Sequence, residues 1–175
     1  MIPGRPVPAV GGHLSPTPGA VDRASVDLRT DVATFTSAPL KSGFQLHGRP
    51  VLQLQAKADQ ASFDLCAALS VCSEGSGEVQ QLSTGVCRVI GDQASTMQAY
   101  RVELQAVEAR LKPGDRLRVS IAGACWPAIA INPGHNEAPC SSPNSSCRVI
   151  SINLDADRST LHLEPLLSTR LSSAV

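Results

Sequence analysis

Aromatic residues are scarce in this chain of 175 residues. They make up 3% of it, with Trp126 the one tryptophan and Tyr100 the one tyrosine. A carbohydrate-binding sandwich needs aromatic rings for sugars to stack on, so this scarcity argues against a glycan ligand. Charged residues are also sparse, at 17%, and the net charge is zero. A balanced charge argues against nucleic acid or an anionic membrane as a partner, because both select basic surfaces.

The sequence motifs of common enzyme classes are missing as well. A hydrolase nucleophile elbow needs G-x-S-x-G, and the nearest serines, Ser76 and Ser83, stand in glycine-containing turns without that spacing. There is no H-E-x-x-H, no phosphate loop and no G-x-G-x-x-G. We therefore predict no catalytic, cofactor-binding or metal-binding residue in this chain, and no cofactor.

The six cysteines include no C-x-x-C pair, and no histidine pair completes a zinc pattern. We interpret them as reduced, partly buried thiols. Cys140 and Cys147 flank a loop rich in Ser, Pro and Asn and would be able to form a bridge in an exported protein, so their redox state stays open. Residues 1–14 lack the apolar segment of a signal peptide, and prolines interrupt the least charged stretch, residues 119–146. We expect a cytoplasmic protein that does not cross a membrane.

Alternation of apolar and polar residues dominates the chain after residue 30 and predicts β-strands. The alternating segments are 51–56, 63–71, 100–106, 117–121 and 150–154. Shorter strands are expected at 32–36, 78–83 and 86–89, and turn sequences such as 112–115 and 132–134 separate the strands. Leu161 and Leu163 follow the polar run 155–159, which predicts a terminal β-hairpin. The pattern predicts an all-β, antiparallel β-sandwich of the jelly-roll, galactose-binding-like kind, with Tyr100 in its core.

Composition divides the chain into three parts. Residues 1–19 hold five prolines and four glycines. Proline cannot donate a backbone hydrogen bond and glycine is costly to order, so residues 1–30 are expected to form an extended arm or linker. The β-sandwich domain is predicted over residues 31–167, followed by a C-terminal tail at 168–175.

The stretch 121–131 is too apolar for a free loop and too interrupted by proline for a simple strand. It either caps the domain's own core or forms an apolar patch that meets another domain, since such patches usually mark interfaces. His135, in the loop that follows, is the one histidine with polar residues close by in sequence. The candidate interdomain interface consists of Trp126, Pro127, Asn132, Pro133 and His135.

An ordered series of short motifs resembles a known family. The run LKPGDRLRVSI at 111–121, followed by Cys125-Trp126-Pro127 and Asn132-Pro133-Gly134, resembles the C-terminal domain of X-Pro dipeptidyl-peptidases and their relatives, the cocaine esterases and α-amino-acid ester hydrolases. Further segments agree in the same order: PVP with GG at 6–12, RTDV at 29–32, FTSAPL at 35–40, GRP at 48–50, FDL at 63–65 and STGVCR at 83–88. The series covers residues 5–167. Asp115 departs from it, because the family usually has histidine there, and the loop 134–147 varies.

The resemblance implies a jelly-roll domain that packs on an α/β-hydrolase catalytic domain within a serine hydrolase. In that family the catalytic serine, aspartate and histidine lie upstream of this domain, so none is carried over to a residue here. Our leading hypothesis is therefore an accessory C-terminal domain whose catalytic partner acts in trans or has been lost from the fragment. The alternative is a stand-alone β-sandwich module that binds a glycan or protein partner. Self-association into a homo-oligomer, the substrate and the chain's own status as an enzyme stay open.

Overall fold

The computed structural model of the chain describes residues 1–12, 15–137 and 146–163. Segments in which apolar and polar residues alternate form the strands in this part of the chain, which also holds one short α-helix and one 3₁₀ turn. The strands are β1 (Val32–Thr36), β2 (Phe44–Gly48), β3 (Val51–Ala58), β4 (Ser62–Cys72), β5 (Val79–Ile90), β6 (Gln98–Glu103), β7 (Val107–Leu111), β8 (Arg116–Ala122) and β9 (Ile152–His162). The helix is α1 (Ala24–Asp27), and the 3₁₀ turn is η1 (Asp92–Ser95).

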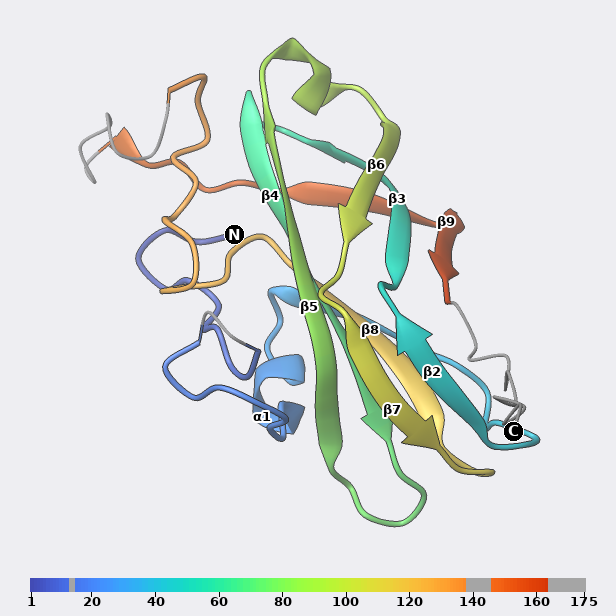
Figure 1. Cartoon of the computed structure of the whole chain (residues 1–175). Helices are drawn as coiled ribbons and strands as arrows, with labels where there is room; N and C mark the ends of the chain where they lie inside the picture. The colour runs from blue at the N-terminus through green and yellow to red at the C-terminus, as the bar shows by residue number, and fades with distance from the viewer. Residues whose placement is uncertain (13–14, 138–145, 164–175) are drawn as a thin grey trace, which may run out of the picture.

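The strands form two antiparallel layers. One sheet has the order β1-β8-β4-β5, and the facing layer consists of the sheet β6-β3-β9 and the pair β2-β7 (Figure 1). Strand β2 leads directly into β3, and β6 leads directly into β7, so a short break separates the strands of each pair. The two breaks lie side by side, because the Leu104 N–H donates to the Pro50 carbonyl. Most connections pass from one layer to the other, as in a jelly roll. The predicted all-β antiparallel sandwich is confirmed.

The inner core lies between the two layers. Phe63 and Leu65 of β4 are fully buried there and face Leu52 and Leu54 of β3. The rings of Phe63 and Tyr100 meet edge to face, with centroids 5.5 Å apart. The predicted place of Tyr100 in the core is thus confirmed, and the alternation of β3, β4, β6 and β8 explains which side chains enter it.

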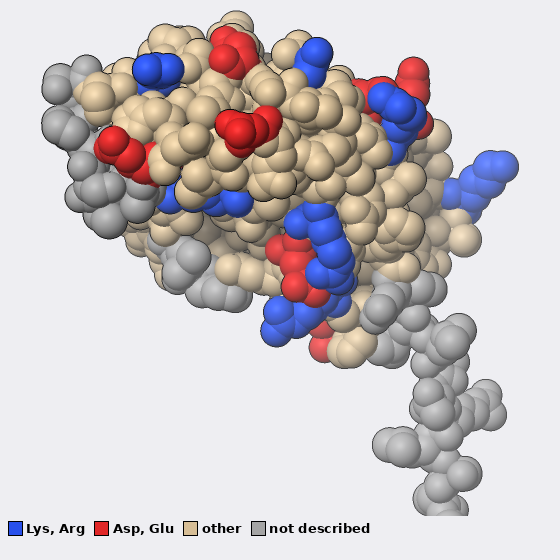
Figure 2. Space-filling model, turned by 90° about the horizontal axis from the view of Figure 1, so that it is seen from above, with Lys and Arg blue, Asp and Glu red and all other residues tan. Residues whose placement is uncertain are grey.

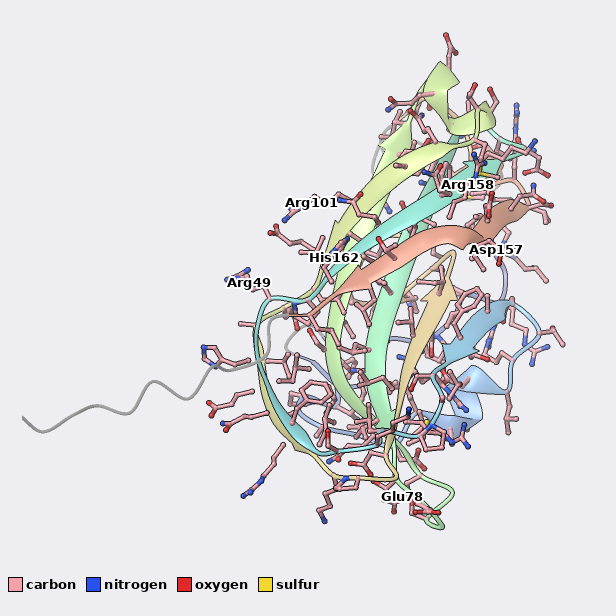
Figure 3. The ribbon with its side chains drawn as sticks, turned by 90° about the vertical axis from the view of Figure 1, so that its right-hand side faces the viewer. Arg49, Glu78, Arg101, Asp157, Arg158 and His162 are labelled. Atoms are coloured by element: carbon pink, nitrogen blue, oxygen red, sulfur yellow. The ribbon has the colours of Figure 1, made fainter. Side chains whose placement is uncertain are left out.

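The predicted terminal hairpin is wrong. Residues 152–162 form the single strand β9, which pairs with β3 on both sides of an irregularity between Gln53 and Gln55. The polar run that resembled a turn is a bulge in β9. The Ser159 hydroxyl donates to the Asp155 carbonyl and accepts a hydrogen bond from the Gln55 N–H. These bonds close the bulge, and β9 pairs with β3 on both sides of it. Asp157 and Arg158 lie on β9 at this bulge (Figure 3).

The two short strands predicted at 78–83 and 86–89 are one long strand, β5. Gly85 continues the pairing, opposite Ala67 of β4. A Cβ at Gly85 would collide with the backbone carbonyl of Glu103, so glycine allows β5 to approach the facing layer closely. Ser83 donates to the Gln105 carbonyl and the Gln105 N–H donates to Thr84, which closes this side of the sandwich.

The described part of the expected arm, residues 1–12 and 15–30, runs along the outer face of the β1-β8-β4-β5 sheet (Figure 1). Val7 and Val26 are buried there, in a second apolar cluster with Val32, Cys66 and Ala122. The segment has little regular structure beyond α1, but it is packed. The domain boundaries at residues 30 and 167 remain predictions, and the tail 168–175 lies outside the described residues.

Charged side chains are spread thinly over the face seen in Figure 2. Positive and negative groups lie beside one another there, with uncharged surface between them. In Figure 3, Arg49 and Arg101 point away from the sandwich. Within the described residues, no helix combines the length and the hydrophobicity needed to cross a bilayer.

Candidate interdomain surface

The segment after β8 is fixed to the N-terminal residues through the backbone of Trp126. The Trp126 N–H donates to the Val7 carbonyl over 2.9 Å, and the Ala9 N–H donates to the Trp126 carbonyl over 2.6 Å. These two bonds form a parallel bridge between Trp126 and Pro8. Because its backbone is held on both sides, Trp126 has a defined position although its side chain is 48% exposed.

A mainly apolar groove lies beside the residues that flank Trp126 in the sequence, since Cys125, Ala128 and Ile129 line it, whereas Trp126 itself does not. It measures about 300 Å³ and lies between the N-terminal segment, β5 and the residues that follow Trp126. Val86 of β5 is 39% exposed there, beside the half-buried Ala128 and Ile129. Arg49 and Glu103 stand among its polar lining residues. We call the side chains of Trp126, Pro127, Ala128, Ile129 and Val86 the Trp126 surface.

A buried polar network anchors the far end of the same loop. Asn132 is 1% exposed and donates from Nδ2 to Asp64 Oδ1 over 3.0 Å. Its Oδ1 accepts hydrogen bonds from Ser62 Oγ at 2.6 Å and from the Gly134 N–H at 2.9 Å. A side-chain amide can donate to a buried carboxylate and, through its oxygen, accept from the backbone N–H of a turn. Asn132 thereby fixes the loop to the start of β4.

The network continues into an ion pair between strands. Arg88 of β5 binds Asp64 of β4 through two parallel hydrogen bonds, at 2.8 and 2.7 Å. Arg88 also donates to the Ala130 carbonyl at 2.6 Å. The Asp64 carboxylate raises the pKa of the Arg88 guanidinium above its ordinary value, so Arg88 stays charged. One arginine therefore connects the sheet to the loop that carries Trp126.

The five residues predicted for the interface fall into different environments. Trp126 and Pro127 are exposed, whereas Asn132 and Pro133 are buried inside the domain. His135 is half-buried: its Nδ1 lies 3.9 Å from Glu137 Oε2, and its carbonyl accepts a hydrogen bond from Ser62.

Sequence reasoning missed Val86, Asp64 and Arg88. Asp64 and Arg88 carry a signal in retrospect, because each is a charge placed within a strongly apolar strand. A charge in such a place requires a partner. Val86 carries no such signal, since its exposure depends on what covers the outer face of β5.

The two serines considered as nucleophiles have structural roles. Ser83 is 3% exposed, and its hydroxyl is used in the bond to Gln105. Ser76 donates to the Ser73 carbonyl and accepts from the Glu78 N–H, which closes the turn between β4 and β5. In the described part of the chain, no three His, Cys, Asp or Glu side chains gather closely enough to hold a metal ion.

Comparison with known families places the chain in one of them. Residues 12–166 match the model of the X-Pro dipeptidyl-peptidase C-terminal non-catalytic domain. The match spans most of the chain, so the chain belongs to this family of non-catalytic C-terminal domains of X-Pro dipeptidyl-peptidase-like hydrolases. A sequence comparison with curated proteins gives no significant match.

Solved structures show the same fold. An aminopeptidase from the marine sediment archaeon Thaumarchaeota archaeon superposes with a TM-score of 0.78 at 21% identity, over 94% of this chain and 32% of that one. An α-amino acid ester hydrolase gives 0.77 at 20% identity, over 94% and 31%. A CocE/NonD family hydrolase from Staphylococcus aureus gives 0.55 at 15%, over 77% and 30%. This chain therefore spans about a third of the length of each hydrolase.

Proposed function

We propose that this chain acts as the accessory domain of a serine hydrolase and docks on an α/β-hydrolase catalytic domain through the Trp126 surface. The catalytic domain supplies the serine, aspartate and histidine, and this chain covers it and shapes access to its acyl- or dipeptidyl-binding pocket. Two findings support the proposal: the family match and the small share of each similar hydrolase that the fold occupies.

One observation of the molecule carries the choice of surface. The backbone of Trp126 is held by bonds to Val7 and Ala9, its indole is half exposed, and its neighbours Cys125, Ala128 and Ile129 line an apolar groove. Tryptophan is enriched at interface hot spots, and a main chain that is already fixed leaves less to be ordered on binding. The anchor through Asn132 and Arg88 holds the other end of the loop in place.

Binding to the catalytic domain tests the proposal. The α/β-hydrolase domain encoded with this chain would be purified separately, and its association with the chain measured by calorimetry. We expect Trp126→Ala to weaken association by roughly thirty-fold, the loss of a hot spot worth about 2 kcal/mol. Leu28→Ala is the matched control, because Leu28 is an apolar side chain that is 85% exposed near α1.

Two results would contradict the proposal. An equal loss of affinity in Trp126→Ala and Leu28→Ala would show that the Trp126 surface is not the docking interface. Hydrolysis of amino-acyl nitroanilides or aryl esters by the purified chain alone, abolished in Ser83→Ala, would show that the chain carries its own active site.

The proposal also covers self-association and location. Without a catalytic domain, the Trp126 surface of two copies would pair, and sedimentation velocity should then give a dimer for the wild type and a monomer for Trp126→Ala. A cytoplasmic location is supported by the free thiols of Cys66, Cys72, Cys87, Cys125 and Cys147, since exported proteins tend to oxidise such groups. Recovery of the chain outside the cell would contradict it.

A further inference from the structure

Two cysteines meet beneath the Trp126 surface. Cys66 lies on β4 opposite Ala122, the last residue of β8, and Cys125 follows three residues later, directly before Trp126. Both belong to the outer apolar cluster and line the same small cavity of about 30 Å³. Each thiol also shifts the pKa of the other. Residues 59 positions apart in the sequence thus line the same small cavity.

The two thiols differ in exposure. Cys66 is 7% exposed and is covered by the N-terminal segment. Cys125 is half-buried and also lines the groove beside Trp126, which opens to the surface. A reagent in the groove therefore reaches the Cys125 sulfur first.

Their protonation differs in the same direction. The hydrogen bond from Cys66 lowers the pKa of the Cys125 thiol, and the charge of Arg23 acts in the same sense. The bond to Cys125 and burial raise the pKa of Cys66. The thiolate is the nucleophile in disulfide exchange, so the more accessible sulfur is also the more reactive one.

We propose that Cys66 and Cys125 form a redox-active dithiol, a modification site at which a low-molecular-weight disulfide oxidant closes a bond between them. Closure ties the residue before Trp126 to the central strand β4, in addition to the backbone bonds with Val7 and Ala9. Bond formation is independent of the proposed docking function. Any effect on docking rests on that function.

The reaction proceeds in two exchanges. The Cys125 thiolate attacks one sulfur of the oxidant, which forms a mixed disulfide and releases one thiolate. The released thiolate takes up the proton of Cys66, and the Cys66 thiolate attacks the Cys125 sulfur and expels the second thiolate, which takes up the proton that Cys125 had lost. The two cysteines lose two electrons and two protons, and the oxidant disulfide is reduced to two thiols.

Titration with glutathione disulfide tests the site in the full, reduced chain. We expect the loss of two thiols, a mass decrease of two hydrogen atoms and a single cross-linked peptide that joins Cys66 to Cys125. The emission of Trp126, the one tryptophan, should fall as the neighbouring disulfide forms. A cross-link between other cysteines, or no thiol loss at oxidant levels that oxidise dithiothreitol, would overturn the proposal.

Variants resolve the order of the steps. Cys66→Ser should stop at a stable glutathione adduct on Cys125, whereas Cys125→Ser should show neither adduct nor bond at position 66. Cys87→Ser is the matched control and should oxidise like the wild type, because Cys87 lies opposite Leu65 and packs against the inner core. Brief alkylation of the native wild-type chain, followed by peptide mapping, also shows which of the two thiols reacts first and needs no variant. Alkylation of Cys66 ahead of Cys125 would contradict the proposed order.

Discussion

The two faces of the β1-β8-β4-β5 sheet are buried by different means. Its inner face packs against the second layer mainly with apolar side chains, such as Phe63, Leu65 and Leu69, all fully buried. Its outer face is covered by residues 1–12 and 15–29 and by the loop after β8, and we call these segments together the outer layer. That face has a small apolar cluster and a series of paired polar groups.

The difference shows how irregular segments can be fixed on a sheet. Arg23 of the outer layer is 6% exposed and binds Asp27 at 2.8 Å and Gln81 at 2.6 Å. Asp64 and Arg88 hold the loop in the same way. Hydrophobic contact is non-directional, whereas these hydrogen bonds set the position of each segment. We therefore expect the inner core to supply most of the stability, while the polar contacts position the loop that carries Trp126.

The largest effect is expected in the inner core. Phe63→Ala removes a fully buried ring and its edge contact with Tyr100, so we expect the free energy of unfolding to fall by about 3–5 kcal/mol. Chemical denaturation followed by circular dichroism measures the loss. Phe35→Ala is the control, because Phe35 is 40% exposed and should lose much less. Similar losses in both variants would show that the inner core is not the dominant source of stability.

A smaller loss is expected in the polar part of the outer layer. Asp64→Ala leaves Arg88 and Asn132 without their partner, which should cost about 2–3 kcal/mol, less than a fully buried pair because Arg88 is 27% exposed. Arg101→Ala is the control, since the pair Arg101–Glu103 is about half exposed and should contribute little. The emission of Trp126 should change in Asp64→Ala only. Unchanged emission would separate the loop from this network.

Acid should weaken the outer layer further. The hydrogen bond from Arg29 lowers the pKa of Asp31, and the same arginine holds the carbonyl of Arg5. The pKa of Asp31 is lower in the folded chain than in the unfolded chain, where it is about 3.9. The ionised Asp31 therefore stabilises the fold at pH values above about 3.9, and this stabilisation is lost as the pH falls through the pKa of the folded state. For a pair this near the surface the loss is below about 1 kcal/mol. Unfolding at pH 7 and pH 3 measures it, and Asp31→Asn should show a smaller difference. Equal differences in both proteins would exclude Asp31 as the cause.

The smallest effect is expected at two buried hydroxyls of the outer face. Ser70 and Ser120, on neighbouring strands, make no side-chain hydrogen bond within the part of the chain that the structure describes. Removing an unsatisfied polar group relieves its desolvation cost. Ser120→Ala should therefore leave the free energy of unfolding unchanged or raise it by less than about 1 kcal/mol. A clear loss of stability would reveal a partner for this hydroxyl.

Much of the inner core could be predicted from the sequence. Alternation in 51–56, 100–106 and 117–121 identified strands and placed Tyr100 inside, because a half-buried antiparallel strand repeats every two residues. The same rule failed on the outer face. Cys66, Ala68 and Ser70 were assigned to the opposite face of 63–71 and are buried as well, since the outer layer covers them.

The candidate site was predicted in part. The apolar, proline-interrupted stretch around Trp126 pointed to an unusual surface, and the structure places Trp126 and Pro127 there, exposed. Asn132 and Pro133 are adjacent in sequence but buried, because the amide of Asn132 is required by Asp64 and Ser62. No local pattern reveals that requirement, since those two partners lie on β4.

The sequence by itself determined most of the strands, much of the inner core and the absence of familiar catalytic motifs, because these depend on short-range periodicity and local spacing. Only the tertiary structure decided that residues 1–12 and 15–29 cover the sheet, that β9 is one bulged strand, and that Cys66 and Cys125 line one cavity. Those features depend on contacts between residues far apart in the chain. A buried hydrogen bond or a pair of thiols leaves no periodic trace in the sequence.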